Sequence, residues 1–257
     1  MKQDEAVKSI SQSLIDDPMV QAIFLKGSMG RGENDEYSDV DLYCLVDEND
    51  EKEFLANRLR HLEAYRNILF SDDIFIIAPQ IIVVYDNLLH VDFFTVTPKS
   101  FKEKDFFQVI YDPKGLLTPF QLTQNLLLSP NEFDVHVTDV AWFLFQYNKA
   151  YKRGNALWAV DMLHQVMTHL SKVLLHRYKP ERAQLGLKAL ESLLPSTQLD
   201  EVRKIFTYIT PDTHELSVQS IISLLQKEIE WIESTLEEGS QAGSFMKTMM
   251  NELECIS

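Results

Sequence analysis

A pair of carboxylates at the start of an apolar run places the strongest constraint on the fold of this chain. Asp39 and Asp41 lie on either side of Val40, and the apolar run continues to Val46. Because side chains alternate across a β-strand, the two carboxylates share one face and the aliphatic side chains point to a core. Two carboxylates repel each other by about 1 kcal/mol at 4 Å in bulk water, and by more in a protein. The pattern therefore predicts a strand whose acidic face binds a cation.

A third carboxylate, Asp92, lies inside a second apolar run, residues 89–94. An ionised carboxylate in such a strand is costly without a partner. If the two strands are neighbours, Asp92 faces Asp39 and Asp41 across the pair. Carboxylate oxygens and substrate phosphates are the usual ligands of Mg²⁺ in proteins. Three carboxylates predict a two-metal site, or a one-metal site with a general base.

A short glycine loop comes before the acidic strand. Gly27 and Ser28 end an earlier apolar run, and ten residues separate Ser28 from Asp39. Glycine lets the backbone turn tightly and approach a ligand, and the amides that follow suit a triphosphate. A P-loop is excluded because Glu33 and Asn34 stand where Lys and Ser or Thr are required. The glycine spacing does not fit G-x-G-x-x-G either.

Together these residues resemble the nucleotidyltransferase signature of the DNA polymerase beta superfamily, in which GS is followed after ten residues by D-x-D and later by an Asp on a strand. The match covers residues 20–46 and the strand of Asp92. The two-domain layout resembles that of the antibiotic nucleotidyltransferases, such as the aminoglycoside and lincosamide enzymes. The resemblance implies an α+β fold. It consists of a mixed-sheet nucleotidyltransferase palm and a C-terminal helical bundle, with the active cleft between them.

The resemblance also implies a role for each site residue. Asp39, Asp41 and Asp92 would be catalytic and would hold Mg²⁺, with Asp92 deprotonating the acceptor or sharing a second metal ion. The implied nucleotide-binding residues are Gly27, Ser28, Arg31, Ser38 and Lys149. An ordinary surface position is the alternative for Arg31 and Lys149. His90 shares the face of Asp92, so it either lines the cleft or packs within the strand.

The implied reaction moves a nucleoside monophosphate from an NTP, ATP in our interpretation, to a hydroxyl group and releases pyrophosphate. The acceptor would be a small cationic molecule such as an aminoglycoside-like antibiotic. The candidate carboxylates to hold it are Glu132, Asp134, Asp139 and Asp161 of the helical segment. An ordinary position on the helix surface is the alternative for Glu132 and Asp161. One rival is a protein-modifying, antitoxin-type adenylyltransferase, which the long helical segment after Pro130 disfavours. A non-catalytic nucleotide-binding module is the other, which the three carboxylates disfavour.

The charge balance restricts the partners of the chain. Lys and Arg number 24 and Asp and Glu 39, which gives a net charge of −15. Since nucleic-acid binding depends on neutralising phosphates, we expect no nucleic-acid partner. We expect no membrane partner either, because no stretch approaches 18 consecutive apolar residues and the first ten residues do not resemble a signal peptide. Two cysteines cannot form a disulfide framework. We therefore expect Cys44 to be a buried thiol and the location to be cytoplasmic, and the oligomeric state stays open.

The chain changes character near residues 126–131, where strand-like runs stop. We therefore expect a catalytic domain at residues 1–128 and a helical, acceptor-side domain at residues 129–257. The expected strands are residues 20–25, 40–46, 81–85 and 88–96, the last two as a hairpin. The expected helices are residues 4–15, 54–66, 133–153, 156–178, 182–194, 199–209 and 218–236. The tail, residues 239–257, is expected to be a loose helix or frayed. The tryptophans are expected in the core of the bundle. Beyond the acidic group, no histidine spacing indicates a metal site.

Overall fold

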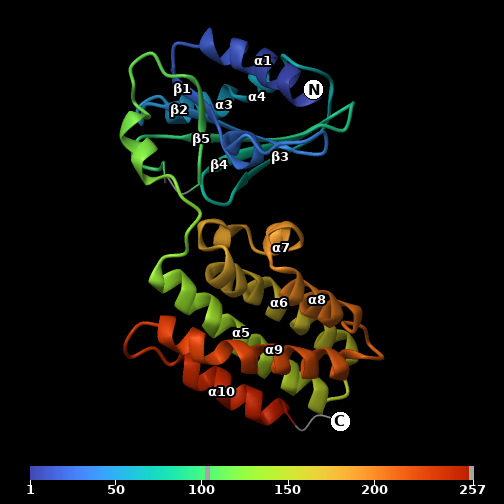
Figure 1. Cartoon of the computed structure of the whole chain (residues 1–257). Helices are drawn as coiled ribbons and strands as arrows, with labels where there is room; N and C mark the ends of the chain where they lie inside the picture. Colours follow the sequence, from blue (N-terminus) through green and yellow to red (C-terminus); the bar gives the residue numbers. More distant parts are fainter. Residues whose placement is uncertain (102–104, 255–257) are drawn as a thin grey trace. The chain divides into compact units, whose positions relative to one another are not determined.

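The computed structural model describes residues 1–101 and 105–254 (Figure 1). The chain divides into two compact units, Met1–Asn125 and Leu126–Ser257. A mixed sheet with helices forms the first unit, and helices alone form the described part of the second. The predicted α+β fold is thus confirmed. Among the described residues, no helix has the length and apolar character needed to cross a bilayer.

One six-stranded sheet organises the first unit, with strand order β3-β4-β5-β2-β1-β6. The strands are β1 (Val20–Leu25), β2 (Val40–Val46), β3 (Ile68–Phe75), β4 (Pro79–Tyr85), β5 (His90–Val96) and β6 (Gln108–Tyr111). Strands β2 and β5 are parallel, and the other neighbouring pairs are antiparallel. The predicted hairpin is confirmed as β4 and β5. The order also makes β2 and β5 neighbours, which the grouping of the three carboxylates requires.

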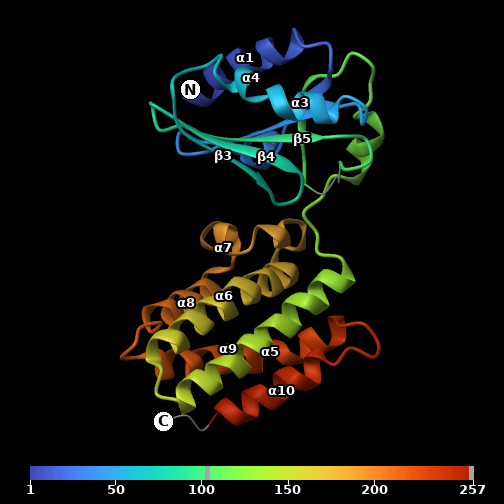
Figure 2. The same cartoon turned by 180° about the vertical axis from the view of Figure 1, so that it is seen from behind.

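Helices cover one face of this sheet (Figure 2). They are α1 (Lys2–Ile15), α3 (Glu51–Asn57) and α4 (Leu59–Leu62). Apolar side chains of these helices pack on those of the strands, and the buried thiol of Cys44 is among them. Burial raises the pKa of that thiol, and the charge of Asp17 adds to the effect. The other cysteine, Cys255, lies outside the described residues.

Three features of the first unit differ from the sequence prediction. The helix expected over residues 54–66 is broken at Arg58, whose buried guanidinium donates to Thr95 Oγ1 (3.0 Å) and Asp73 Oδ1 (2.7 Å). The edge strands β3 and β6 were not predicted. Neither strand has a fully buried side chain, so both lack the alternation that marks a half-buried strand.

An aromatic layer packs on the opposite face of the sheet. Tyr43 stacks on Phe94 with ring centroids 4.4 Å apart, and on Phe24 at 5.2 Å. Asp41 and Asp92 precede Tyr43 and Phe94 by two residues, so they share the face of the aromatic rings. Asp41 and Asp92 thus lie beside the aromatic layer, on the same face of the sheet.

The second unit is built from long helices and short connections (Figures 1 and 2). Its elements are α5 (Pro130–Lys152), α6 (Ala156–Tyr178), the 3₁₀ helix η2 (Pro180–Leu185), α7 (Leu187–Leu193), α8 (Ser196–Thr207), α9 (His214–Thr235) and α10 (Ala242–Leu253). Ser129 and Glu132 form a capping box at the start of α5, and Asn155 caps α6. One apolar core joins all of these helices.

The second unit differs from the sequence prediction in three places. The helix over residues 182–194 is instead η2 and α7, because Gly186 has a φ of +56° that breaks the helix between them. The tail contains an ordered helix, α10, because Met246 and Leu253 bury their side chains in the core. Trp142 does not lie in the core, since 46% of its surface is exposed.

Candidate active site

The glycine loop leads directly from β1 into a short helix, α2 (Gly27–Arg31). Gly27 has a φ of +59°, and a Cβ atom there would lie only 1.9 Å from Asp41 Oδ2. The amide of Lys26 donates to the carbonyl of Asp41 (3.0 Å), which ties the loop to β2. The absent side chain of Gly27 is therefore what allows the Asp41 carboxylate to lie against the loop.

Two of the predicted carboxylates are direct neighbours in the sheet. The parallel register of β2 and β5 pairs Asp41 with Asp92. Gln80 on β4 donates from Nε2 to Asp92 Oδ1 (2.6 Å). Sequence reasoning missed Gln80, although a single amide within an apolar strand was an available signal. Gln80 is 3% exposed, so this bond is sheltered from water and orients the Asp92 carboxylate.

Asp39 and His90 complete the acidic group. One ligand atom from each of Asp39, His90 and Asp92 lies within 4.8 Å of the other two, an arrangement that can hold a metal ion. The Nδ1 atom of His90 is 3.9 Å from Asp39 Oδ2, and its Nε2 is 3.2 Å from Asp92 Oδ1. The buried Nε2 makes no hydrogen bond within the described residues. Asp41 is not one of these three residues, since its carboxylate lies against Gly27.

A buried glutamine holds the loop that carries Asp39. Gln3 on α1 donates from Nε2 to the carbonyls of Asp35 (3.1 Å), Glu36 (3.1 Å) and Ser38 (2.8 Å). The Ser38 hydroxyl donates to Asp35 Oδ1 (3.0 Å) and accepts from the Asp35 amide (3.0 Å). The hydroxyl of Ser38 thus supports the loop, and its contact with a nucleotide stays a prediction.

Arg31 and Lys149, the two basic side chains predicted to bind phosphate, already make contacts within the protein. Arg31 donates to Glu33 (2.8 Å) and Asp105 (2.7 Å), and its side chain is 11% exposed. Burial lowers the pKa of Arg31, but the two carboxylates more than offset this and hold the pKa above its ordinary value. Lys149 lies on α5 with its ammonium 5.2 Å from the centroid of the Phe145 ring. Phosphate binding by either side chain stays a prediction.

The tyrosine of the aromatic layer carries no charge beside the carboxylates. Burial raises the pKa of Tyr43, and the charges of Asp41 and Asp92 raise it further. Its phenol therefore stays protonated at neutral pH and adds no negative charge to the site. The Lys26 ammonium lies 5.5 Å from the centroid of the Tyr43 ring, within the range of a cation–π contact.

The family of this chain follows from comparison with known proteins. Residues 4–133 match the sequence model of the nucleotidyltransferase domain, which is half of the chain. The chain belongs to the nucleotidyltransferase domain family. The predicted resemblance to a DNA polymerase beta-like nucleotidyltransferase is thereby confirmed. Membership supports nucleotidyltransferase activity and implies a nucleotide substrate.

Solved structures similar to this chain include an aminoglycoside 6-adenyltransferase from Bacillus subtilis. It has 12% identity and a TM-score of 0.40, and the match covers 99% of this chain and 100% of that one. A nucleotidyltransferase-like protein from Exiguobacterium sibiricum has 12% identity and a TM-score of 0.35, covering 98% and 73%. The Elizabethkingia meningoseptica cyclic dinucleotide synthase CdnE has 14% identity and a TM-score of 0.31, covering 98% and 92%. Curated protein sequences gave no match. Similarity at this level carries no inference about a substrate.

Most of the acidic residues expected to bind the acceptor of this nucleotidyltransferase have local partners. Glu132 caps α5, Asp134 accepts from Thr138 Oγ1 (3.3 Å), and Asp139 lies 3.2 Å from His169 Nδ1. These contacts reduce the number of carboxylates that can meet a cationic acceptor without losing another interaction. Whether any of these residues binds the acceptor stays a prediction.

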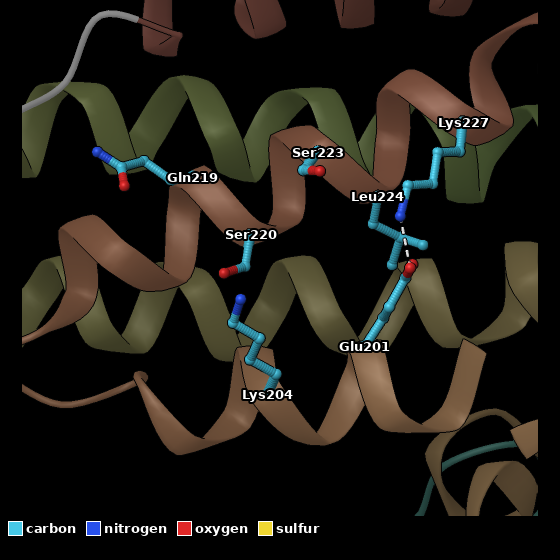
Figure 3. Close-up of a pocket in the computed structure, with 7 residues that line it drawn as sticks. All are labelled: Glu201, Lys204, Gln219, Ser220, Ser223, Leu224 and Lys227. Atoms are coloured by element: carbon cyan, nitrogen blue, oxygen red, sulfur yellow. Dashed lines mark hydrogen bonds and ion pairs between the residues drawn. The ribbon is translucent and has the colours of Figure 1, made fainter. Parts of the chain in front are cut away.

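A pocket between α8 and α9 is a poor match for such an acceptor (Figure 3). The residues that line it are Glu201, Lys204, Gln219, Ser220, Ser223, Leu224 and Lys227. Lys227 pairs with Glu201 at 2.5 Å. The charge of Lys204 is not balanced by another lining residue, so the residues that line the pocket carry a net positive charge. A cationic molecule would be repelled there.

Proposed function

We propose that this protein transfers a nucleoside monophosphate from an NTP, ATP first among them, to a hydroxyl of a small cationic acceptor such as an aminoglycoside-like antibiotic, and releases pyrophosphate. The observation that carries the proposal is the pairing of Asp41 with Asp92 beside the Gly27 loop, in a member of the nucleotidyltransferase family. In this proposal residues 1–128 perform catalysis and residues 129–257 bind the acceptor.

The acidic group fits a divalent cation. Asp39 and Asp92 offer carboxylate oxygens close together, Asp41 is the register neighbour of Asp92, and the buried His90 Nε2 has no hydrogen bond within the described residues. Mg²⁺ prefers oxygen ligands, so we assign the three carboxylates as its ligands and His90 as a neighbour of the site. A bound Mg²⁺ would stabilise negative charge that develops on the phosphate oxygens.

Asp92 is proposed to take the proton of the acceptor hydroxyl. The freed oxygen attacks the α-phosphorus, a new phosphorus–oxygen bond forms, and the bond to the bridging oxygen of the β-phosphate breaks. The electron pair of that bond leaves with pyrophosphate. Gln80 keeps the Asp92 carboxylate in one orientation for this transfer. The backbone at Gly27 and the hydroxyl of Ser28 are proposed to approach the phosphates, because no side chain at Gly27 obstructs them.

The acceptor class is tested by stimulation of pyrophosphate release from ATP and Mg²⁺. We expect aminoglycosides to stimulate release more than neutral sugars, tRNA or protein extracts, because the net charge of −15 attracts polycations. Raising the salt should weaken the stimulation, since exposed charges are screened over about 8 Å at 0.15 M. Mass spectrometry should find one added nucleoside monophosphate on the acceptor. If a protein gains that mass and no aminoglycoside or lincosamide does, the protein-modifying rival is correct.

Gln80→Leu is expected to lower the kcat/KM of pyrophosphate release by about 10–100-fold, the usual cost of losing a residue that orients a ligand. The apolar replacement removes the hydrogen bond to Asp92 but fits the apolar strand, so the melting temperature should change little. Gln108→Leu, at an exposed position of β6, is the matched control and should leave the rate unchanged. Equal rates for the two variants would show that Gln80 does not position Asp92.

A further inference from the structure

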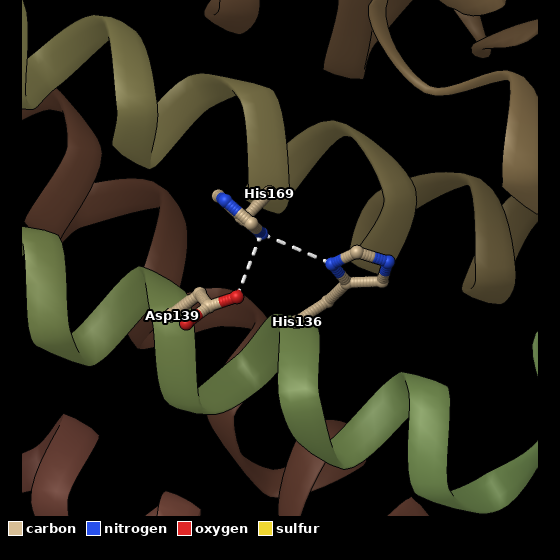
Figure 4. A group of neighbouring side chains, drawn as sticks. All are labelled: His136, Asp139 and His169. Atoms are coloured by element: carbon tan, nitrogen blue, oxygen red, sulfur yellow. Dashed lines mark hydrogen bonds and ion pairs between the residues drawn. The ribbon is translucent and has the colours of Figure 1, made fainter. Parts of the chain in front are cut away.

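A second group of metal-binding side chains lies within the helical unit (Figure 4). His136 and Asp139 stand about one turn apart on α5, and His169 faces them from α6. The Nδ1 atom of His169 is 3.0 Å from His136 Nδ1 and 3.2 Å from Asp139 Oδ2. All three ligand atoms lie within 4.8 Å of one another.

Hydrogen bonds alone satisfy this arrangement poorly. If His169 Nδ1 carries a hydrogen, it must divide that hydrogen between His136 Nδ1 and the Asp139 carboxylate. If His136 Nδ1 carries the hydrogen instead, the lone pair of His169 Nδ1 faces a carboxylate oxygen at 3.2 Å. Each choice leaves one short contact without a full hydrogen bond. A cation at the centre would instead accept a lone pair from each of the three atoms.

The spacing matches the edges of a tetrahedral metal site. Ligand bonds of about 2.0–2.1 Å at tetrahedral angles place neighbouring ligand atoms about 3.3 Å apart. The two short separations, 3.0 and 3.2 Å, lie close to this value. Three protein ligands would leave a fourth position for water. The side chains of Asp139 and His169 are 33% and 20% exposed, so an ion can enter from solvent.

The surroundings favour the ligand form of the imidazole. Phe143 stacks on His169 with ring centroids 5.5 Å apart, which limits the orientation of the imidazole. Burial lowers the pKa of His169, Asp139 raises it and Lys172 lowers it, with a net lowering. A neutral imidazole is the form that binds metal. Two imidazoles and one carboxylate suit Zn²⁺ and its neighbours among the transition metals better than Mg²⁺.

We propose that His136, Asp139 and His169 bind one divalent transition-metal ion, with Zn²⁺ as the best match to the donor set. Since the ligands come from α5 and α6, the ion would crosslink the two longest helices of the unit. The site is separate in sequence from the carboxylates of the first unit. Its existence does not depend on the proposed reaction.

The test is a titration of the full chain with Zn²⁺ by calorimetry and with Co²⁺ by visible absorption, in millimolar Mg²⁺. Every protein in this test, called the background protein when it has no other change, carries Asp39→Asn and Asp92→Asn. These two changes prevent the acidic group of the first unit from contributing to the measured metal binding. We expect one bound equivalent and the visible bands of low-coordinate Co²⁺. His136→Gln and His169→Gln should each weaken binding by at least about 100-fold, above the 10–100-fold typical of outer-shell partners. The control His164→Gln changes an exposed histidine of α6 and should bind normally.

Thermal melts separate loss of the site from loss of the fold. Zn²⁺ should raise the melting temperature of the background protein and of His164→Gln, but not that of His136→Gln. Asp139→Asn provides a third variant that keeps nearly the same shape, and it should also weaken binding. The proposal is overturned if the background protein binds no equivalent. It is also overturned if His136→Gln and Asp139→Asn, still folded, bind Zn²⁺ with unchanged affinity.

Discussion

Asp92→Asn is expected to reduce nucleotidyl transfer by at least about 1,000-fold, within the range that positioned acid–base groups contribute. The change removes the proposed base and one charge from the acidic group, while the amide fits the same space. Without metal the melting temperature should stay constant or rise, because the variant relieves repulsion between Asp92 and its register neighbour Asp41. Rates of pyrophosphate release and melts with and without Mg²⁺ measure both effects.

Asp72→Asn is the matched control for this variant. Asp72 lies exposed on the edge strand β3, so its loss of charge should leave the rate unchanged. The assigned role of Asp92 would be contradicted by a variant that keeps its activity. It would also be contradicted by a clear loss of stability without metal. That result would mean that the Asp92 carboxylate stabilises the fold, rather than being destabilised by repulsion from Asp41.

Gly27→Ala is expected to reduce activity and binding of Mg²⁺–ATP by about 100-fold or more, since even about 1 Å of misplacement can cost this much. The new Cβ would meet Asp41 Oδ2 at 1.9 Å, so the carboxylate must rotate out of its position. The positive φ of +59° adds a conformational cost of about 1–2 kcal/mol. Calorimetry with ATP and the rate of pyrophosphate release measure the loss.

Gly32→Ala separates the clash from the conformational cost. Gly32 also has a positive φ, +69°, but a Cβ atom added there would have no neighbouring atom within 4 Å. The variant should therefore lose a similar amount of stability and keep its activity. Equal losses of activity in the two variants would mean that backbone strain, rather than displacement of Asp41, explains the effect.

The carboxylates could be predicted because their signal is local. The Asp-x-Asp pattern before an apolar run predicted the acidic face, although Asp39 itself lies in the loop just before β2. Only the pairing of β2 with β5 was then needed to bring Asp92 beside Asp41. Gln80 could not be placed in the same way. Its contact with Asp92 depends on the register of β4 against β5, and this register cannot be read from the spacing of residues in the sequence.

Contacts between distant residues explain the other differences. Arg31 contacts Asp105, which lies 74 positions further along the chain, and sequence spacing could not reveal this contact. His136 and His169 are 33 positions apart, and only the packing of α5 on α6 brings their rings together. A search for histidines at metal-binding spacings along the sequence therefore missed them.

The central claim is that the α-phosphate of the nucleotide moves to a hydroxyl acceptor. The most direct measurement incubates the protein and Mg²⁺ with an aminoglycoside panel and ATP labelled on either the α- or the γ-phosphate. We expect the α label on the modified acceptor and the γ label in pyrophosphate, in equal amounts, with neither product formed by Asp92→Asn. Transfer of the γ label to the acceptor, or the same products from Asp92→Asn, would contradict the account.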